Sequence, residues 1–267
     1  MKKIKSGYII TSSAFVINKN KIKYYTTIDG CPEVGDVVYG YITSVGLHSQ
    51  LENKNGRIHS ITEGTRGIFV FGNRYAPDFL EGIVDNTNSD EVDLLARSGV
   101  IGKLITKNSN QKDTTKVKII GYVCDSDGNK INTTKLPILK KEKENKSKII
   151  LIIGTSMNSG KSQSASACCW TLSTSGYSTN GLKITGTASL KDILRMQDSG
   201  ANKIADFTYL GYPSTYLLDA HALKNIFMQL ISNYGNSDYL VVEIADGILQ
   251  REVDILLSMP EVYAVRP

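Results

Sequence analysis

The stretch IILIIGTSMNSGKS, residues 149–162, constrains the fold of this chain more than any other. Five apolar residues with strand propensity end at Gly154, and Gly160-Lys161-Ser162 opens a run rich in Ala and Ser that favours a helix. A loop between a strand and a helix N-terminus points several backbone N–H groups at one place, where the helix dipole and a lysine add positive charge. The pattern predicts a loop that binds a chain of phosphates, with the Ser162 hydroxyl available to Mg²⁺.

The spacing of this loop is a variant. The usual phosphate loop has four residues between its first glycine and the Gly-Lys pair, a spacing that would put the glycine at Thr155. Here Gly154 is separated from the pair by five residues. A flexible strand-to-helix turn with an exposed lysine is the alternative, but a strand such as 149–153 directly before the loop favours phosphate binding.

Length and composition set the outer bounds. With 267 residues the chain can form two domains. No apolar run is long enough to cross a membrane, and the N-terminus MKKIKSGYII is too interrupted for a signal peptide, so we expect a cytoplasmic protein without a membrane partner. The cysteines have no metal-ligand spacing, which favours buried free thiols over a disulfide or a zinc site. They are Cys31, Cys124, Cys168 and Cys169.

Charge divides the chain unevenly. Residues 1–148 contain 23 Lys and Arg and 16 Asp and Glu, a net charge of +7, whereas residues 149–267 contain 8 and 10, a net charge of −2. The basic excess therefore belongs to the N-terminal half.

Residues 1–136 have the pattern of a β-rich domain. Alternating patches at 7–17, 36–45, 67–72 and 116–123 are separated by turn signals such as Asp29-Gly30, Asn55-Gly56 and Asp127-Gly128. A small closed or nearly closed barrel hides so many strand edges most economically. The segment 81–102 is the exception, because VDLLARSGVIG favours a short helix that covers one end of the barrel.

The segment PEVGDVVYGYITSVGLHSQLENKNGR, residues 32–57, resembles the opening hairpin of an OB-type barrel. Such a barrel implies a nucleic-acid face made of aromatic and basic side chains. The candidates are Tyr39, Tyr41, His48, Arg57 and Arg74. The alternative, which we favour, is that both tyrosines are ordinary cross-strand residues of a hairpin; nucleic acid is therefore a partner compatible with the sequence but not the favoured one.

Residues 137–148, PILKKEKENKSK, form a mixed-charge run without apolar periodicity and are predicted to be a linker. Residues 149–267 then read as an α/β domain. Helices are predicted at 161–174, 190–197 and 215–233, and strands at 149–153, 181–185 and 239–244. Strands that alternate with helices imply a parallel sheet, whose ligands gather at the carboxyl ends of the strands.

Polar motifs follow these strands. Lys183 lies near the end of one, Glu243 near the end of another, and a turn at 212–215 lies between them in the chain. We expect all of them to converge on the phosphate loop. An acid after the apolar run Leu240-Val241-Val242 is the arrangement by which a nucleoside triphosphatase holds Mg²⁺ or orients a water. The alternative role for Glu243 is to cap the next helix.

The loop GTSMNSGKS is similar to the variant phosphate loop of dethiobiotin synthetase and its relatives, G-T-x-x-x-x-G-K-[ST]. LKITGT resembles the second-strand lysine region of that family, and VVEIADG resembles its V-E-G-A-G-G strand end. The loop and the turn Pro213-Ser214-Thr215-Tyr216 also resemble uncharacterised two-domain bacterial P-loop proteins. Where the synthetases carry a loop glutamate this chain has Asn158, and Asp246-Gly247 replaces their glycine pair.

The resemblance implies an ATP- and Mg²⁺-binding enzyme. In the positions that match, it implies that Lys161, Lys183 and Glu243 act in catalysis and that Ser162 and Glu243 hold the metal. The phosphate-binding set is Gly154, Thr155, Ser156, Asn158, Ser159, Gly160, Lys161 and Ser162.

We therefore predict a β-rich, OB-like or small-barrel domain followed by a P-loop α/β domain with a parallel sheet. The region after residue 148 is short for this class, and a strand predicted to begin near Tyr263 points to a truncated or minimal form. The leading functional hypothesis is an ATP-dependent ligase- or kinase-like enzyme that activates a small carboxylate, carbamate or amine. The alternatives are a nucleotide-dependent switch whose β-domain binds nucleic acid or protein, and a phosphate-binding module without turnover.

Two further points stay open in the sequence. Residues 149–267 contain no guanine-type N-K-x-D run, which favours ATP without excluding GTP. A homodimer is also compatible with the sequence.

Overall fold

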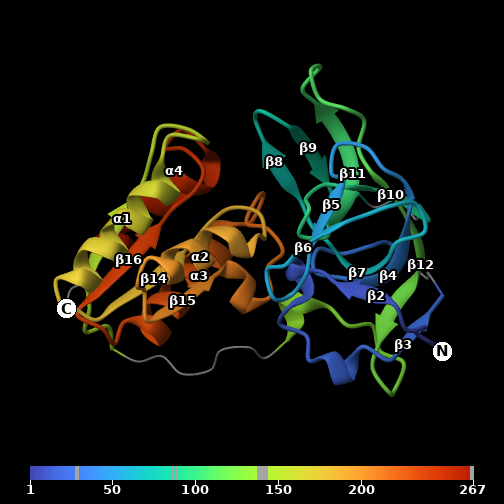
Figure 1. The fold of residues 1–267 in the computed structure, drawn as a ribbon, viewed down its shortest axis with the longest axis horizontal. Helices are drawn as coiled ribbons and strands as arrows, with labels where there is room; N and C mark the ends of the chain where they lie inside the picture. The colour runs from blue at the N-terminus through green and yellow to red at the C-terminus, as the bar shows by residue number, and fades with distance from the viewer. Residues whose placement is uncertain (28–29, 86, 88, 137–143, 265–267) are drawn as a thin grey trace. The chain divides into compact units, whose positions relative to one another are not determined.

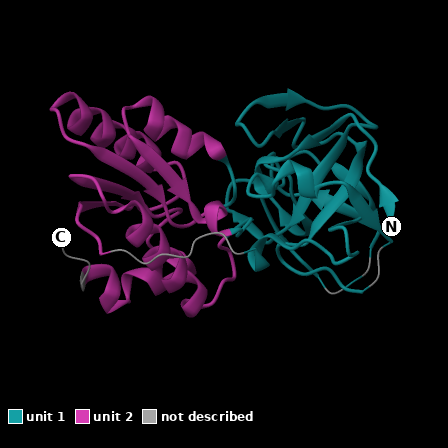
Figure 2. Ribbon diagram, turned by 90° about the horizontal axis from the view of Figure 1, so that it is seen from below, with its two compact units in different colours: residues 1–136, 187–189, 211–214 teal, residues 137–186, 190–210, 215–267 magenta. Residues whose placement is uncertain are grey.

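The structure is a computed structural model that describes residues 1–27, 30–85, 87, 89–136 and 144–264. The fold is mixed α/β, with one large β-rich sheet and a separate parallel sheet (Figure 1). Contacts group the chain into two compact units (Figure 2). Unit 1 comprises residues 1–136, 187–189 and 211–214, and unit 2 comprises residues 137–186, 190–210 and 215–267.

Unit 1 consists mainly of short strands with three 3-10 turns. The strands are β1 (Lys2–Lys3), β2 (Tyr8–Ile10), β3 (Tyr24–Thr26), β4 (Val37–Ser44), β5 (Gln50–Glu52), β6 (Ile58–Ser60), β7 (Arg66–Phe71), β8 (Arg74–Ala76), β9 (Leu80–Ile83), β10 (Glu91–Leu94), β11 (Val100–Lys107) and β12 (Lys116–Cys124). The 3-10 turns are η1 (Ser12–Ala14), η2 (Lys19–Lys21) and η3 (Thr133–Lys135).

Within the described residues, five of these strands pair in a closed ring. β4 pairs antiparallel with β7 and with β12, and β7 pairs parallel with β11. β10 closes the ring because it pairs antiparallel with both β11 and β12. Each strand of the ring therefore has a hydrogen-bonded neighbour on both sides, which removes the exposed edges that promote association.

The strand β4 has apolar residues on both faces. Val38 and Ile42 belong to one buried cluster, whereas Val37 and Tyr39 belong to another. Successive side chains of a strand point to opposite faces, so burial on both sides explains why its sequence is continuously apolar rather than alternating. β4 is accordingly a central strand of unit 1.

The favoured interpretation, that Tyr39 and Tyr41 are cross-strand residues of β4, is confirmed by their pairing with β7 and β12, and two of the alternative nucleic-acid candidates do not fit such a face. Tyr39 is only 2% exposed and packs against the rings of Tyr8 and Tyr25, so it offers no surface for a base to stack on. His48 lies beside Arg74, with 3.1 Å between its Nε2 and the arginine Nη1. Burial, reinforced by Arg74, lowers the pKa of His48 to about 4, so it carries no charge at neutral pH.

Two expected local structures in unit 1 are wrong. The second strand of the predicted hairpin, β5, pairs with β6 rather than with β4. The segment 81–102 contains no helix in its described residues; it carries β9, β10 and the start of β11. The helical expectation fails because Gly99 has a φ of 86° and turns the chain, which lets β10 and β11 pair as a hairpin.

Unit 2 alternates strands and helices. Its elements are β13 (Lys148–Ile152), α1 (Lys161–Thr174), β14 (Thr179–Lys183), α2 (Leu190–Asp198), β15 (Lys203–Asp206), η4 (Phe207–Leu210), α3 (Ala220–Tyr234), β16 (Tyr239–Glu243), α4 (Arg251–Leu257) and α5 (Pro260–Ala264). The four strands are parallel in the order β13-β16-β14-β15.

Most of the elements predicted for unit 2 are confirmed. Helix α1 has the predicted bounds, and α2 and the three predicted strands agree within about two residues. Helix α3 begins later than expected because Asp219 caps it, accepting a hydrogen bond from Ala222 N at 2.7 Å.

Of two segments predicted near the ends of unit 2, one is wrong and the other lies largely outside the described residues. The strand expected near Tyr263 is wrong, because α5 occupies the segment up to Ala264. In the predicted linker, residues 137–143 lie outside the described residues, and β13 begins at Lys148.

Candidate functional site

The loop between β13 and α1 is shaped by two glycines. Gly160 has a φ of 91°, which L side chains adopt only with strain, and it starts α1 without a side-chain cap. A Cβ on Gly154 would lie 2.3 Å from Ser159 Oγ and 2.8 Å from Lys161 Cγ, so only glycine lets the loop fold back this closely. The first N–H groups of α1 therefore face the loop without a capping side chain, as an anion site requires.

Lys161 bends over this loop. Its Nζ donates a hydrogen bond to Ser156 O at 2.7 Å, and only 7% of the residue is exposed. Burial lowers the pKa of Lys161, although the carboxylates of Asp246 and Glu243 oppose that effect. The ammonium group is thus partly desolvated and held at the mouth of the loop, where an anion would strengthen its charged form.

One basic and two acidic side chains lie in one row across the sheet. Lys183 is the register partner of Glu243 on one side and of Asp206 on the other. All three are the last residues of their strands, β14, β16 and β15. Because register partners in a parallel sheet project from the same face, the row puts one cation between two acids at the carboxyl edge.

Glu243 connects this row to the loop. Ser162 Oγ donates a hydrogen bond to Glu243 Oε1 at 3.0 Å, while the buried Oε2 has no partner among the described residues. Burial raises the pKa of Glu243, and the nearby Lys183 partly offsets that rise. An unpartnered buried carboxylate oxygen is costly in a folded protein, and it is commonly explained by an absent ligand or water.

Lys183 forms a buried ion pair with Asp192, a residue of α2 that the sequence did not single out. Burial disfavours the charged lysine, but Asp192, Glu243 and Asp246 outweigh it and raise the pKa of Lys183. Lys183 therefore carries its positive charge at any physiological pH. An acid in the first turn of a helix is common for helix-dipole reasons alone, so the sequence held no specific signal for Asp192.

Asp206 is a second residue that sequence reasoning missed. Its Oδ1 accepts a hydrogen bond from Thr208 N at 2.9 Å, and its buried Oδ2 has no partner among the described residues. Burial raises its pKa to about 6, with the Thr208 hydrogen bonds opposing the shift. The available signal was its place at the end of the short apolar run Ile204-Ala205, which was not recognised as a strand.

Lys161, Ser162, Lys183, Asp192 and Glu243 line one pocket of about 360 Å³, whereas Asp206 is not among its lining residues. Of the predicted set, Asn158, Gly160, Lys161, Ser162, Lys183 and Glu243 line it, together with Asp246. Gly154, Thr155, Ser156 and Ser159 belong to the same loop without lining the pocket. The lining also includes Met157 of the loop and four residues from α1 and α2 that were not predicted, namely Gln163, Lys191, Asp192 and Arg195.

One predicted contributor belongs elsewhere. Residues 211–214 group with unit 1 rather than with the residues of this pocket. Thr215, which follows them, accepts a hydrogen bond from Gly186 N at 2.9 Å through its hydroxyl. Thr215 therefore has a structural role beside Gly186, which follows the strand that carries Lys183.

The oxygen donors of the pocket suit Mg²⁺ that is shared with phosphates. Mg²⁺ is usually held by one or two carboxylates together with substrate phosphates and waters. Ser162 Oγ and the unpartnered Glu243 Oε2 match that donor set. Within the described part of the chain no group of three or more His, Cys, Asp or Glu could hold a metal ion.

The cysteines are free thiols, as predicted, and Cys124 and Cys169 are buried; the expected burial is wrong for Cys31, which is exposed, and only partial for Cys168. Among the described helices, none has the length and apolar character that a bilayer crossing demands. No protein-family model matches the chain, and no curated protein sequence matches it either.

Proposed function

We propose that the chain is a Mg²⁺-dependent ATP-binding enzyme of the dethiobiotin synthetase-like P-loop class. In this proposal unit 2 is the P-loop α/β domain and unit 1 is an OB-like small barrel. The enzyme activates a small carboxylate, carbamate or amine by phosphoryl transfer or ligation. The closed five-strand ring of unit 1 supports the barrel assignment, because an OB-fold is a five-stranded Greek-key barrel.

One observation carries the proposal: the first helical turn after a glycine-shaped loop meets a strand-end carboxylate within a single pocket. Ser162 contacts Glu243, and Lys161 lines the same space. A bare strand-to-helix turn with an exposed lysine would need neither a buried lysine nor a buried glutamate. This pairing of loop and acid is the arrangement used to bind a nucleoside triphosphate with its metal.

Each side chain has a definite task in this proposal. The N–H groups that start α1 hold phosphate oxygens, and Lys161 exchanges its bond to Ser156 O for a phosphate oxygen. Bound Mg²⁺ supplies charge neutralisation of the phosphates. Ser162 and Glu243 would hold it.

Lys183 supports the second substrate. Because Asp192 keeps it charged and fixed, it orients an anionic group such as a carboxylate or carbamate. A substrate oxygen or nitrogen then attacks the terminal phosphorus, the bond from that phosphorus to the bridging oxygen breaks, and ADP leaves with that oxygen. Lys191 and Arg195, which also line the pocket, add cations that suit an acidic partner.

The test measures nucleotide binding by calorimetry and ADP release with Mg²⁺ present, over a panel of small carboxylates, carbamates and amines. The proposal expects ATP to bind more tightly than GTP and one class of small molecule to stimulate ADP release. Stimulation by nucleic acid alone would support the regulatory switch instead. Absence of nucleotide binding would overturn both.

A further inference from the structure

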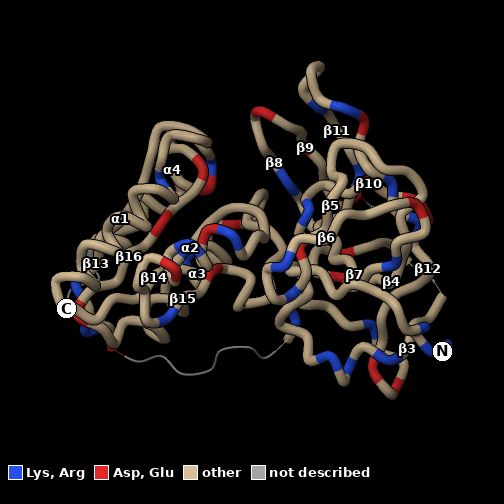
Figure 3. Tube along the Cα trace, viewed as in Figure 1, with Lys and Arg blue, Asp and Glu red and all other residues tan. Residues whose placement is uncertain are grey.

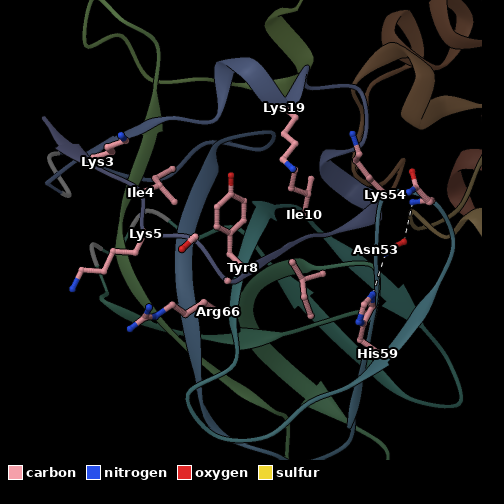
Figure 4. A pocket seen from close by; sticks show the side chains of 14 residues that line it. Lys3, Ile4, Lys5, Tyr8, Ile10, Lys19, Asn53, Lys54, His59 and Arg66 are labelled. Atoms are coloured by element: carbon pink, nitrogen blue, oxygen red, sulfur yellow. Dashed lines mark hydrogen bonds between the residues drawn. The ribbon is translucent and has the colours of Figure 1, made fainter.

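A second pocket, in unit 1, is lined by cations. It has a volume of about 970 Å³ and lies among β1, β2, η2, the β5–β6 hairpin and the start of β7. Its charged lining residues are Lys3, Lys5, Lys19, Lys54 and Arg66 (Figure 4). None of the fourteen residues drawn as its lining is Asp or Glu. We call it the basic pocket.

The cations of the basic pocket have no acidic partner among the described residues. Within the described residues, none of the five forms an ion pair, whereas Lys103, Lys116, Lys118 and Lys135 each pair with a carboxylate. Figure 3 shows Lys and Arg recurring along the first segments of the chain near the N-terminus. Like charges gathered without counter-charges repel one another, and an anionic ligand would relieve that repulsion.

An aromatic ring lies at the centre of these cations. Tyr8 on β2 is the register partner of Arg66 on β7, so the two residues start from neighbouring positions on adjacent strands. The ring is half-buried and positioned, since its hydroxyl donates to Ile22 O at 3.4 Å and its edge meets the Tyr39 ring at 6.2 Å between centroids. A fixed ring flanked by cations is the platform on which a nucleic-acid base stacks.

The cations are spread rather than focused. In Figure 4, Lys3, Lys5 and Arg66 lie on one side of Tyr8, Lys54 lies on the other, and Lys19 extends from η2 toward the ring. A single phosphate is best held by groups that converge on one point. Cations distributed around a long opening suit phosphates that are themselves spaced along a strand.

The rim also offers an amide and an imidazole. Asn53 Nδ2 and His59 Nε2 lie 3.0 Å apart, and both residues line the pocket. The turn is firmly held, because Asn53 Oδ1 accepts hydrogen bonds from Asn55 N at 2.9 Å and Arg57 N at 3.0 Å. Amide and imidazole groups on a fixed turn can hydrogen-bond base edges that a single strand leaves exposed.

We infer that the basic pocket of unit 1 binds single-stranded nucleic acid, with Tyr8 stacking on a base and Lys19, Lys54 and Arg66 contacting successive phosphates. The site is separate from the phosphate loop and does not depend on the function proposed for unit 2. It also differs from the sequence-predicted face, whose Tyr39 is buried.

The test uses the full-length chain and a fluorescent oligothymidylate of about twelve nucleotides, a length within the range that single-strand-binding barrels cover. Fluorescence anisotropy is measured without ATP at several salt concentrations. The logarithm of the association constant should fall linearly with the logarithm of the salt concentration. The double variant Lys19→Ala/Lys54→Ala should bind about tenfold or more weakly at low salt. The slope of its log association constant against log salt should be about 1.4 smaller in magnitude, because two phosphate contacts are gone.

Matched controls isolate the basic pocket. Lys103→Ala/Lys112→Ala removes the same charge from unit 1 outside the pocket and should leave the salt slope unchanged. Tyr8→Phe should bind like the parent, whereas Tyr8→Leu should weaken binding about fivefold or more. Lys161→Ala should bind the oligonucleotide normally; loss of binding there would move the contact to the phosphate loop and overturn the inference.

Two other results would also overturn it. Equal competition by polyglutamate at the same charge concentration would make the basic pocket a general polyanion surface. Tighter binding of a duplex of the same length, unaffected by Tyr8→Leu, would exclude base stacking. Because no assay here uses nucleotide hydrolysis, failure of this inference leaves the proposal for unit 2 standing, and the reverse also holds.

Discussion

The hydroxyl of Ser162 donates a hydrogen bond to Oε1 of Glu243 over 3.0 Å, joining the first turn of α1 to the last residue of β16. The bond fixes one carboxylate oxygen and leaves the other unpartnered among the described residues. Glu243 is therefore oriented by the protein without being satisfied by it.

Glu243→Gln should retain ATP binding and lose Mg²⁺-dependent turnover by about a hundredfold or more, because the amide still accepts from Ser162 but has no charge. Calorimetry and ADP release measure the two effects separately. The control is Glu261→Gln, which changes a half-buried acid of α5 paired with Lys224 and should alter neither. Unchanged turnover in Glu243→Gln would assign this residue a purely structural role.

Lys161→Ala should reduce ATP affinity about a hundredfold or more without lowering the unfolding midpoint. The reason is that a charge-assisted hydrogen bond to phosphate is lost, while the fold loses only bonds within the loop, to Ser156 O and Ser159 Oγ. Titration with a fluorescent ATP analogue checks the prediction, with Lys203→Ala, an exposed lysine at the start of β15, as the matched control. An unchanged affinity would remove the central claim about the loop.

Lys183→Met should lower the free energy of unfolding by about 3 to 5 kcal/mol, because it leaves Asp192 and Glu243 near one another without their cation. The double variant Lys183→Met/Asp192→Leu should be less destabilised than the single one. Urea titration of the parent, the two single variants Lys183→Met and Asp192→Leu, and the double variant completes a double-mutant cycle. The cycle gives the interaction free energy between the two side chains. Strictly additive effects would show that the two side chains do not depend on each other.

Asp206 should make stability fall as pH rises from about 4 to about 6. In this window the folded protein retains a proton on Asp206, whose pKa is about 6, while the unfolded chain has released it at its ordinary pKa of 3.8. The folded state therefore binds more protons, and the free energy of unfolding decreases by on the order of 3 kcal/mol across the window.

Asp206→Asn should abolish that contribution, since the amide oxygen still accepts from Thr208 N and cannot ionise. Urea titrations of the parent and the variant at several pH values give the difference. The exposed Asp198→Asn is the control and should follow the parent. A parent-to-variant difference that is independent of pH would show that Asp206 is not proton-linked to folding.

The sequence predicted the site best where all the residues that define an element lie close together in the chain. The strand before Gly154 and the helix after Gly160 were readable because both the apolar run and the glycine-lysine pair lie within a few residues. Lys183 and Glu243 followed from their positions at strand ends. Whether they act on a nucleotide stays a prediction.

Elements whose identity depends on distant partners could not be predicted in the same way. Val92, Leu94 and Leu95 form an apolar run that suits either a helix or a strand, and pairing with β11 and β12 decides for the strand. Asp206 was missed because β15 is only four residues long and begins with the polar Lys203. Its burial arises from α2 and α3, which no window around Asp206 reveals.

Unit 1 includes residues 187–189, and this membership has a consequence for the order of folding during synthesis. Ala188 belongs to the same buried cluster as Leu95 and Val100. A ribosome must therefore release the phosphate loop, α1 and β14 before the last side chain of that cluster emerges. The N-terminal unit can therefore complete the packing of this cluster only after residues up to Ala188 have left the exit tunnel.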